Sequence, residues 1–138
     1  MKTINHECYV SLEVAKLLKK AGFNWECKMI HFCYVEDDYM WNLEDNDKKA
    51  RSILELDYCL LAPTLDVAQR WLREVKNISI AISSTNYSEY KYIIRKVNQS
   101  HYSDNTILAL TACGFYTYEE AQEAGIKKAL EIILEKRE

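Results

Sequence analysis

Cysteine and histidine side chains give this chain its clearest capacity for chemistry. Cys27, His31 and Cys33 would lie on one face of a strand, and His6 and Cys8 lie upstream of them. Thiolates and imidazoles are the common ligands of structural zinc, but such sites use cysteine or histidine pairs at short fixed spacings, which this sequence lacks. We therefore predict no metal site. We interpret the cysteines as buried thiols and His31 as a hydrogen-bonded core residue.

A cysteine with a histidine beside it could also act as a nucleophile. However, no family signature surrounds any cysteine, and the chain has no glycine-rich phosphate loop, H-E-x-x-H motif or G-x-S-x-G motif. The segment 101–104 contains the residue types of a catalytic triad, but neighbours in a turn point apart. We predict no catalytic residue and no cofactor. A hydrolytic or small-molecule-binding role ranks third, and it requires a deep pocket with Cys8 or Cys33 beside His31.

The segment 36–49 is acidic and polar, which indicates a long, mobile surface loop. Its carboxylates suggest calcium, but the segment lacks the central glycine and the regular ligand alternation of a calcium-binding loop. Tyr39, Met40 and Trp41 are large side chains within this polar segment. They either fold back onto the core or contact a partner, so Tyr39 and Trp41 are candidate partner contacts.

Apolar stripes at helical spacing predict three amphipathic helices, which start near Ser11, Thr64 and Thr117. Ser11 and Thr64 are good N-caps, and Gly22 can adopt the left-handed conformation that ends the first helix. The second helix would run to residue 76 and the third to residue 135. Thr117 and Glu120 have the spacing of a capping box.

Alternating or β-branched segments predict strands at 28–35, 54–60, 78–83, 90–97 and 106–111, and a helix from near Asp47 is an alternative to the second of these. The last three strands would form an antiparallel meander. The predicted fold is α+β: a single domain over 1–138 with an antiparallel sheet of three to five strands packed by helices. Its α-β-β-β-α core at 63–138 follows an N-terminal helix, strand and acidic loop.

The composition narrows the class of protein. Hydrophobic residues make up 49% of the chain and charged residues 28%, which excludes an intrinsically disordered protein. A formal charge of −3 disfavours a nucleic-acid partner, because such proteins usually present a basic face. No apolar run has the length of a signal sequence or of a membrane span. We therefore expect a cytoplasmic protein with reduced cysteines and no membrane partner.

Aromatic side chains are abundant, with ten tyrosines and three tryptophans. Tyr90 and Tyr92 would share one face of a strand. Tyrosine and tryptophan give a large contact area for little lost rotamer freedom, so they are common at protein interfaces. Together with Tyr39 and Trp41 they form the predicted partner surface. The leading hypothesis is therefore a non-catalytic protein that binds another protein or forms a homodimer.

Three motifs carry a resemblance to a known group of proteins. They are the string 9–18 (YVSLEVAKLL), the string Ala62-Pro63-Thr64 followed by QRWLREV at 69–75, and the string GFxTYEEA at 114–121. These motifs resemble small uncharacterised proteins of phages, prophages and Bacteroides-type gut bacteria. The resemblance covers most of the chain and implies a phage or prophage origin, but no activity.

The predicted α-β-β-β-α order also resembles double-stranded-RNA-binding domains, and the segment 114–121 resembles antitoxins of the HicB type. This likeness implies an alternative function as a nucleic-acid-associated regulator. The phosphate contacts would then be Arg70, Arg73, Lys91, Arg95 and Lys96. RNA-binding members place lysines at the start of the last helix, where Glu119, Glu120 and Glu123 would instead repel phosphate. We therefore disfavour this alternative.

Overall fold

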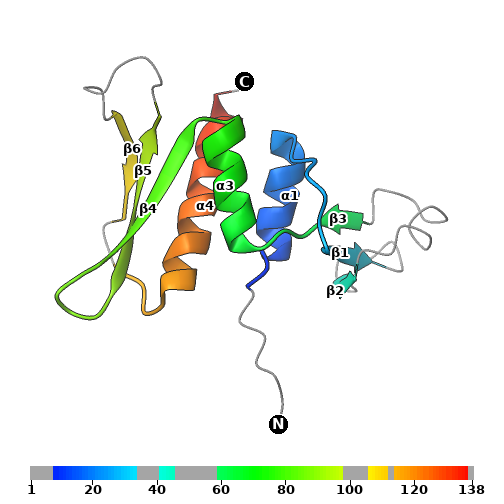
Figure 1. Ribbon diagram of the computed structural model, residues 1–138, viewed down its shortest axis with the longest axis horizontal. Helices are drawn as coiled ribbons and strands as arrows, with labels where there is room; N and C mark the ends of the chain where they lie inside the picture. Colours follow the sequence, from blue (N-terminus) through cyan, green and yellow to red (C-terminus); the bar gives the residue numbers. More distant parts are fainter. Residues whose placement is uncertain (1–7, 34–40, 46–58, 98–105, 112–113, 137–138) are drawn as a thin grey trace, which may run out of the picture.

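The computed structural model describes residues 8–33, 41–45, 59–97, 106–111 and 114–136 (Figure 1). The first elements along the chain are α1 (Leu12–Ala21), β1 (Met29–Cys33), β2 (Trp41–Asp45) and β3 (Cys59–Leu61). They are followed by α3 (Leu65–Val75), β4 (Ile78–Ser84), β5 (Tyr90–Lys96), β6 (Thr106–Leu110) and α4 (Tyr118–Glu135). The predicted α+β class is confirmed. None of the helices in these ranges combines the length and apolar character needed to cross a bilayer.

The second half of the chain forms a two-layer core. β4, β5 and β6 lie in that spatial order in one antiparallel sheet, and α3 and α4 cover the same face of it (Figure 1). Ile80 on β4 pairs with Ile94 on β5, and both side chains are buried beneath the helices. The alternation of isoleucine with small residues predicted that β4 is buried on one face, and this prediction is confirmed.

The helices begin where their capping residues predict. The Ser11 hydroxyl accepts a hydrogen bond from the Val14 amide at the start of α1. Thr64 caps α3 in the same way, and Thr117 caps α4. Gly22, with φ of +98°, ends α1 in the left-handed conformation that a glycine adopts without strain.

One hydrophobic cluster connects the two halves of the described chain. It contains residues of α1, β3, α3, β4, β5 and α4, and Trp71 is among its largest fully buried side chains. α1 also contacts α4 through polar groups at the surface. The Lys127 ammonium lies 2.8 Å from a carboxylate oxygen of Glu13, and this ion pair raises the pKa of Lys127.

A second sheet, β2-β1-β3, lies beyond α1 at the other end of the molecule (Figure 1). The prediction of an uninterrupted loop over 36–49 is wrong for Trp41–Asp45, which pairs with β1 along its whole length. Asparagine and aspartate are poor strand formers and tryptophan is a good one, so the propensity of this segment is mixed. Pairing with β1 satisfies its backbone groups. The remainder of that predicted loop lies outside the described residues.

The end of the predicted strand over 54–60 lies in a strand, as predicted. β3 (Cys59–Leu61) pairs with β1, so that Leu60 lies beside His31. Residues 54–58 and the alternative helix start at Asp47 are outside the described ranges. Sequence alternation indicated an extended segment here, but it carried no information about which strand would be its partner.

Candidate interaction surface

The structure describes three of the side chains that the sequence offered as metal ligands, those of Cys8, Cys27 and His31. His31 lies on the central strand β1, and its Nε2 atom donates a hydrogen bond to the Val10 carbonyl at 2.8 Å. Because a carbonyl oxygen only accepts, Nε2 must carry a proton and cannot bind a metal in this state. Cys27 precedes the strand, and its thiol faces the Trp25 carbonyl at 3.4 Å. The side chain of Cys33 and the whole of His6 are not described.

The Cys27 thiol is poorly suited to act as a nucleophile. Burial, assisted by the nearby Glu26 carboxylate, raises the pKa of Cys27 from 9.0 to about 11. The reactive thiolate is therefore scarce near neutral pH, and the sulfur is shielded from solvent. Within the described ranges, no three His, Cys, Asp or Glu side chains gather into a metal-binding group.

We expect Cys27 to resist alkylation by iodoacetamide at about pH 8 in the native protein, because thiolate formation and access are both suppressed. Peptide mass spectrometry after timed labelling would measure the rate. Cys8, which is exposed, provides the comparison within the same chain. Unfolding in denaturant should bring Cys27 to full labelling, whereas rapid native labelling would contradict the buried position.

A polar cavity of about 390 Å³ lies where α3 and α4 begin. It is lined by Cys8, Thr64, Leu65, Asp66, Tyr118, Glu119 and Gln122. Gln122 is buried, and its amide nitrogen donates to Asp66 at 2.7 Å and to Gln69 at 2.8 Å. Gln69 in turn donates to the Ile80 carbonyl at 2.7 Å. These side chains form hydrogen bonds with one another and with β4, and so they hold α3, α4 and β4 together.

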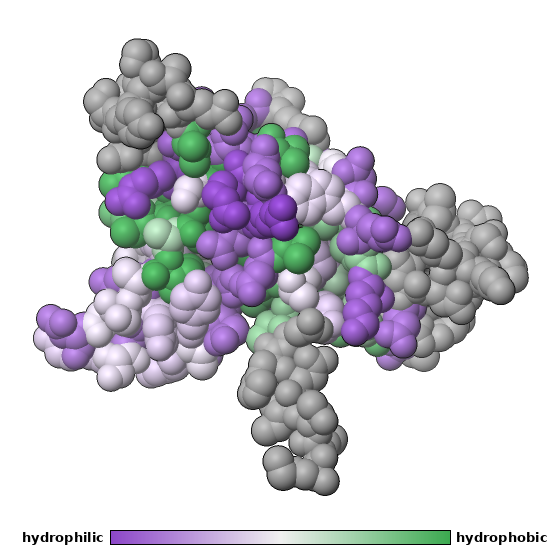
Figure 2. All heavy atoms as spheres, viewed as in Figure 1, coloured by the Kyte–Doolittle hydropathy of each residue, from purple (hydrophilic) through white to green (hydrophobic). Residues whose placement is uncertain are grey.

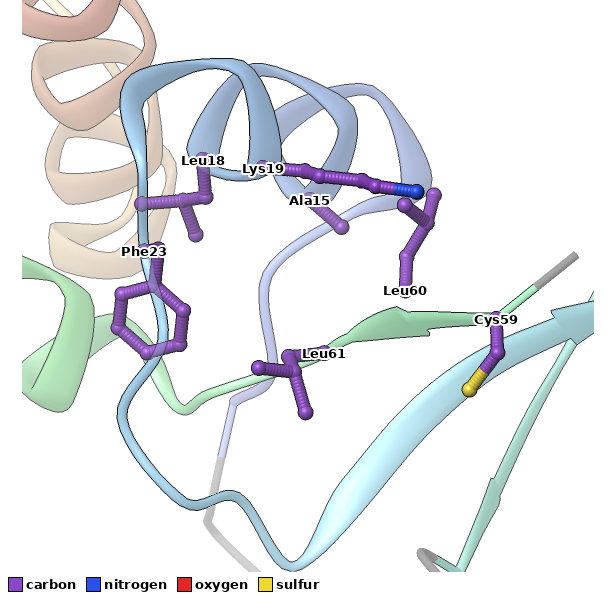
Figure 3. A pocket seen from close by; sticks show the side chains of 7 residues that line it. All are labelled: Ala15, Leu18, Lys19, Phe23, Cys59, Leu60 and Leu61. Carbon is purple, nitrogen blue, oxygen red and sulfur yellow. The ribbon is translucent and has the colours of Figure 1, made fainter. Parts of the chain in front are cut away.

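An apolar cavity of about 230 Å³ lies between α1 and β3, with Leu18 and Phe23 at one end and Cys59 at the other (Figure 3). Its remaining lining comes from Ala15, Lys19, Leu60 and Leu61. Pockets for small molecules usually enclose roughly 300 to 1,000 Å³. His31 lines neither cavity, so neither holds the thiol and imidazole pair that a hydrolytic role requires.

The tyrosines of β5 share one face of the strand, but α4 covers that face. Tyr92 is half-buried, and its Cβ would lie 3.2 Å from a Cβ atom added to Gly125 of α4. Tyr92 also stacks on Phe115, and Tyr90 makes an edge contact with Tyr118. Burial and the nearby Glu131 raise the pKa of Tyr92. Both rings are therefore occupied by contacts within the chain.

The other two predicted partner contacts are placed less fully. Trp41 lies on β2, but its side chain is not described, and Tyr39 lies outside the described residues. Asn42 and Leu43, which follow Trp41 on β2, are exposed. The tetrad at 101–104 also lies outside the described ranges.

The predicted phosphate contacts are divided between opposite sides of the molecule. Arg70 and Arg73 are exposed on α3, and the hydrophilic face of the helix layer is visible in Figure 2. Arg70 pairs with Glu74 at 2.8 Å and lies over the Trp25 ring. Lys91 and Arg95 lie instead on the sheet face that points away from the helices, whereas Lys96 alternates to the helix side. These five residues do not form one basic surface.

The face of the β4-β5-β6 sheet that points away from α3 and α4 is the candidate site. Strand pairing arranges it in three rows across the sheet, Ser83–Lys91, Ala81–Ile93–Leu110 and Ser79–Arg95–Ile107. We call these eight residues the outer face. No helix or strand of the described chain lies against it (Figure 1).

A β-bulge enlarges the apolar part of the outer face. Residues three apart on a regular strand point to opposite faces, yet Ile107 lies opposite Arg95 and Leu110 lies opposite Ile93. The register shift between Ile94 and Arg95 leaves Leu108 as the extra residue of β6. Bulges commonly redirect side chains in this way. Both Ile107 and Leu110 therefore point outward.

These outward side chains are open to solvent. Ile107 is 48% exposed and Leu110 is 59% exposed, and Ala81 is also exposed. Figure 2 shows apolar residues gathered on the side of the molecule that this sheet forms. Scattered exposed apolar residues are ordinary, but neighbours in register on an uncovered sheet make a contiguous patch, which is typical of an interaction site.

Sequence reasoning did not identify Ala81, Ile93, Ile107 and Leu110 as site residues. The available signal was the run Thr106–Leu110, which is apolar on both faces and so cannot be buried by helices on one side alone. That pattern predicts a strand with an apolar outer face. The bulge that sets its orientation has no local signature.

Comparison of the chain with protein-family models, with curated proteins and with solved structures found no match to any of them.

Proposed function

We propose that this chain is a non-catalytic accessory protein of phage or prophage origin that acts in the cytoplasm by binding another protein or a second copy of itself. The contact surface is the outer face. The observation that carries the proposal is the apolar row Ala81–Ile93–Leu110, extended by Ile107, on a sheet whose opposite face is already covered by α3 and α4.

Physical chemistry supports a protein partner. Burying apolar side chains against a partner releases about 25 cal/mol for each Å² removed from water. The outer face is supported by a rigid sheet, so little conformational entropy is lost when it is covered. Its polar rows, which contain Ser83, Lys91, Ser79 and Arg95, flank the apolar row. An apolar centre with a polar rim is the usual arrangement of a protein interface.

The test pairs light scattering with affinity capture. The native protein should either form a dimer over a concentration series or capture one protein specifically from its native host. In the variant Ile107→Lys/Leu110→Lys the same association should weaken by at least about tenfold, because lysine side chains interrupt the apolar row. Both residues are exposed, so the variant should keep its fold by circular dichroism.

Val75→Lys provides the matched control, because Val75 is 47% exposed but lies on α3. It should associate as the native protein does. A strictly monomeric native protein that captures no protein would contradict the proposal. Association that is equally strong in the outer-face variant would also contradict it.

The nucleic-acid alternative rests on Lys91 and Arg95, which share the outer face. Phosphate contacts would make binding fall steeply with salt. An electrophoretic mobility series with duplex RNA and duplex DNA, from low to physiological salt, tests this alternative. A complex that is lost in Lys91→Gln/Arg95→Gln would support it, and absence of any complex at low salt would remove it.

A further inference from the structure

The outer face carries two cations, one on each side of its apolar row. Lys91, Ile93 and Arg95 alternate along β5, so their side chains emerge on the same face. Successive side chains on one face of a strand are about 7 Å apart, which places the two cations roughly 13 Å apart with Ile93 between them. A ligand that covers Ile93 therefore meets a positive charge at both ends.

Arg95 is only partly satisfied by its surroundings. Within the described residues its Nε atom is buried without a hydrogen-bond partner. This atom is covered by the chain itself, so a partner would contact Arg95 through the other nitrogens of its guanidinium group. A guanidinium group can hold a carboxylate through two parallel hydrogen bonds. The Glu89 carboxylate is turned elsewhere: its Oε2 lies 3.0 Å from where a Cβ atom on Gly114 would stand.

Two other occupants fit the outer face less well. A second copy packed face to face about a twofold axis through Ile93 would bring cation against cation. Lys91 would meet Arg95 if the axis crosses β5, and each would meet its own copy if the axis runs along β5. Like charges brought against each other across an interface are unfavourable. Single-stranded nucleic acid needs aromatic stacking partners. The rings of Tyr90 and Tyr92 pack on the helix side and cannot supply them.

We propose that the occupant of the outer face is an acidic amphipathic segment of another protein. Its apolar side chains cover Ala81, Ile93 and Leu110, and its carboxylates pair with Lys91 and Arg95. This inference rests on the proposed function, because it specifies the chemistry of the partner that the outer face binds.

The experiment selects random linear peptides by phage display on the immobilised full-length protein. Enriched peptides should combine apolar residues with flanking aspartate or glutamate. Their synthetic, fluorescently labelled forms should bind in an anisotropy titration, and affinity should decrease as salt is raised. In Lys91→Gln/Arg95→Gln the affinity should fall by about tenfold or more, and Leu110→Lys should cause a similar loss.

Arg73→Gln/Lys128→Gln is the matched control, because it removes the same number of positive charges from exposed positions on α3 and α4. Its affinity should remain within about twofold of the native value, since exposed charges distant from the site are largely screened. Enrichment of neutral or basic peptides would overturn the inference. Acidic peptides that bind Lys91→Gln/Arg95→Gln as tightly as they bind the control Arg73→Gln/Lys128→Gln would also overturn it.

The outcomes also separate this inference from the proposed function. If Ile107→Lys/Leu110→Lys abolishes association with a protein or with a second copy but no acidic peptide is enriched, the proposed function is supported and the acidic partner is excluded. If the native protein neither associates nor enriches any peptide, both proposals are contradicted.

Discussion

Trp71→Ala should lower the free energy of unfolding by about 3 to 5 kcal/mol, the usual cost of replacing a buried tryptophan with alanine. Trp71 is 1% exposed at the centre of the hydrophobic cluster. Phe23 packs on its ring edge with centroids 5.4 Å apart, so the substitution removes an aromatic contact and leaves a cavity between α3 and the segment after α1.

Urea denaturation followed by circular dichroism measures this loss. Tyr87→Ala is the control, because Tyr87 is 85% exposed in the turn between β4 and β5, and the change there should stay within about 0.5 kcal/mol. A loss below about 1 kcal/mol for Trp71→Ala would mean that the Trp71 ring does not occupy the core as described.

Gly125→Val should lower the free energy of unfolding by about 1 to 3 kcal/mol, because α4 lies too close to the sheet to accept a side chain. A Cβ atom at Gly125 would stand 2.9 Å from Cγ2 of Ile80 and 3.2 Å from Cβ of Tyr92. The first atom is a methyl group on the stiff β-branch of Ile80 and the second is bonded to the backbone, so neither can give way easily and the helix must move. Helix propensity alone would slightly favour the substitution, since glycine is the poorer helix former.

Ala124→Val is the matched control, because it places the same β-branched residue at the preceding, half-buried position of α4. It should cost only about 0.5 kcal/mol, which is the difference in helix propensity. The two variants are compared in the same denaturant titration. A Gly125→Val variant as stable as the native protein would show that α4 does not approach β4 and β5 closely.

The helices were predictable because their signals are local. The Thr64 side chain and the stripe that contains Ala68, Trp71 and Leu72 lie within one continuous segment, and the same residues cap and bury α3 in the structure. The inward face of β4 was predictable for the same reason, because isoleucine alternates with small residues. Both patterns repeat with the period of the element they form.

Strand partners were not predictable, because they join segments that are distant in the sequence. In β2 only Trp41 and Leu43 alternate with polar residues, a signal too short to stand out within an acidic segment, and pairing with β1 is what shows it to be a strand. Which side of β5 is left uncovered was uncertain for a related reason. The sequence shows that Tyr90 and Tyr92 share a face, but not that α4 covers it and leaves Lys91, Ile93 and Arg95 outward.

The sequence by itself determined the α+β class, the helix starts and the buried face of β4, because capping and periodicity act within a few residues of the chain. Only the tertiary structure decided which residues form the outer face. The strand Thr106–Leu110 is apolar on both sides, so its orientation depends on its register with β5. The extra residue Leu108 shifts that register and turns both Ile107 and Leu110 away from the helices, a result that no local pattern encodes.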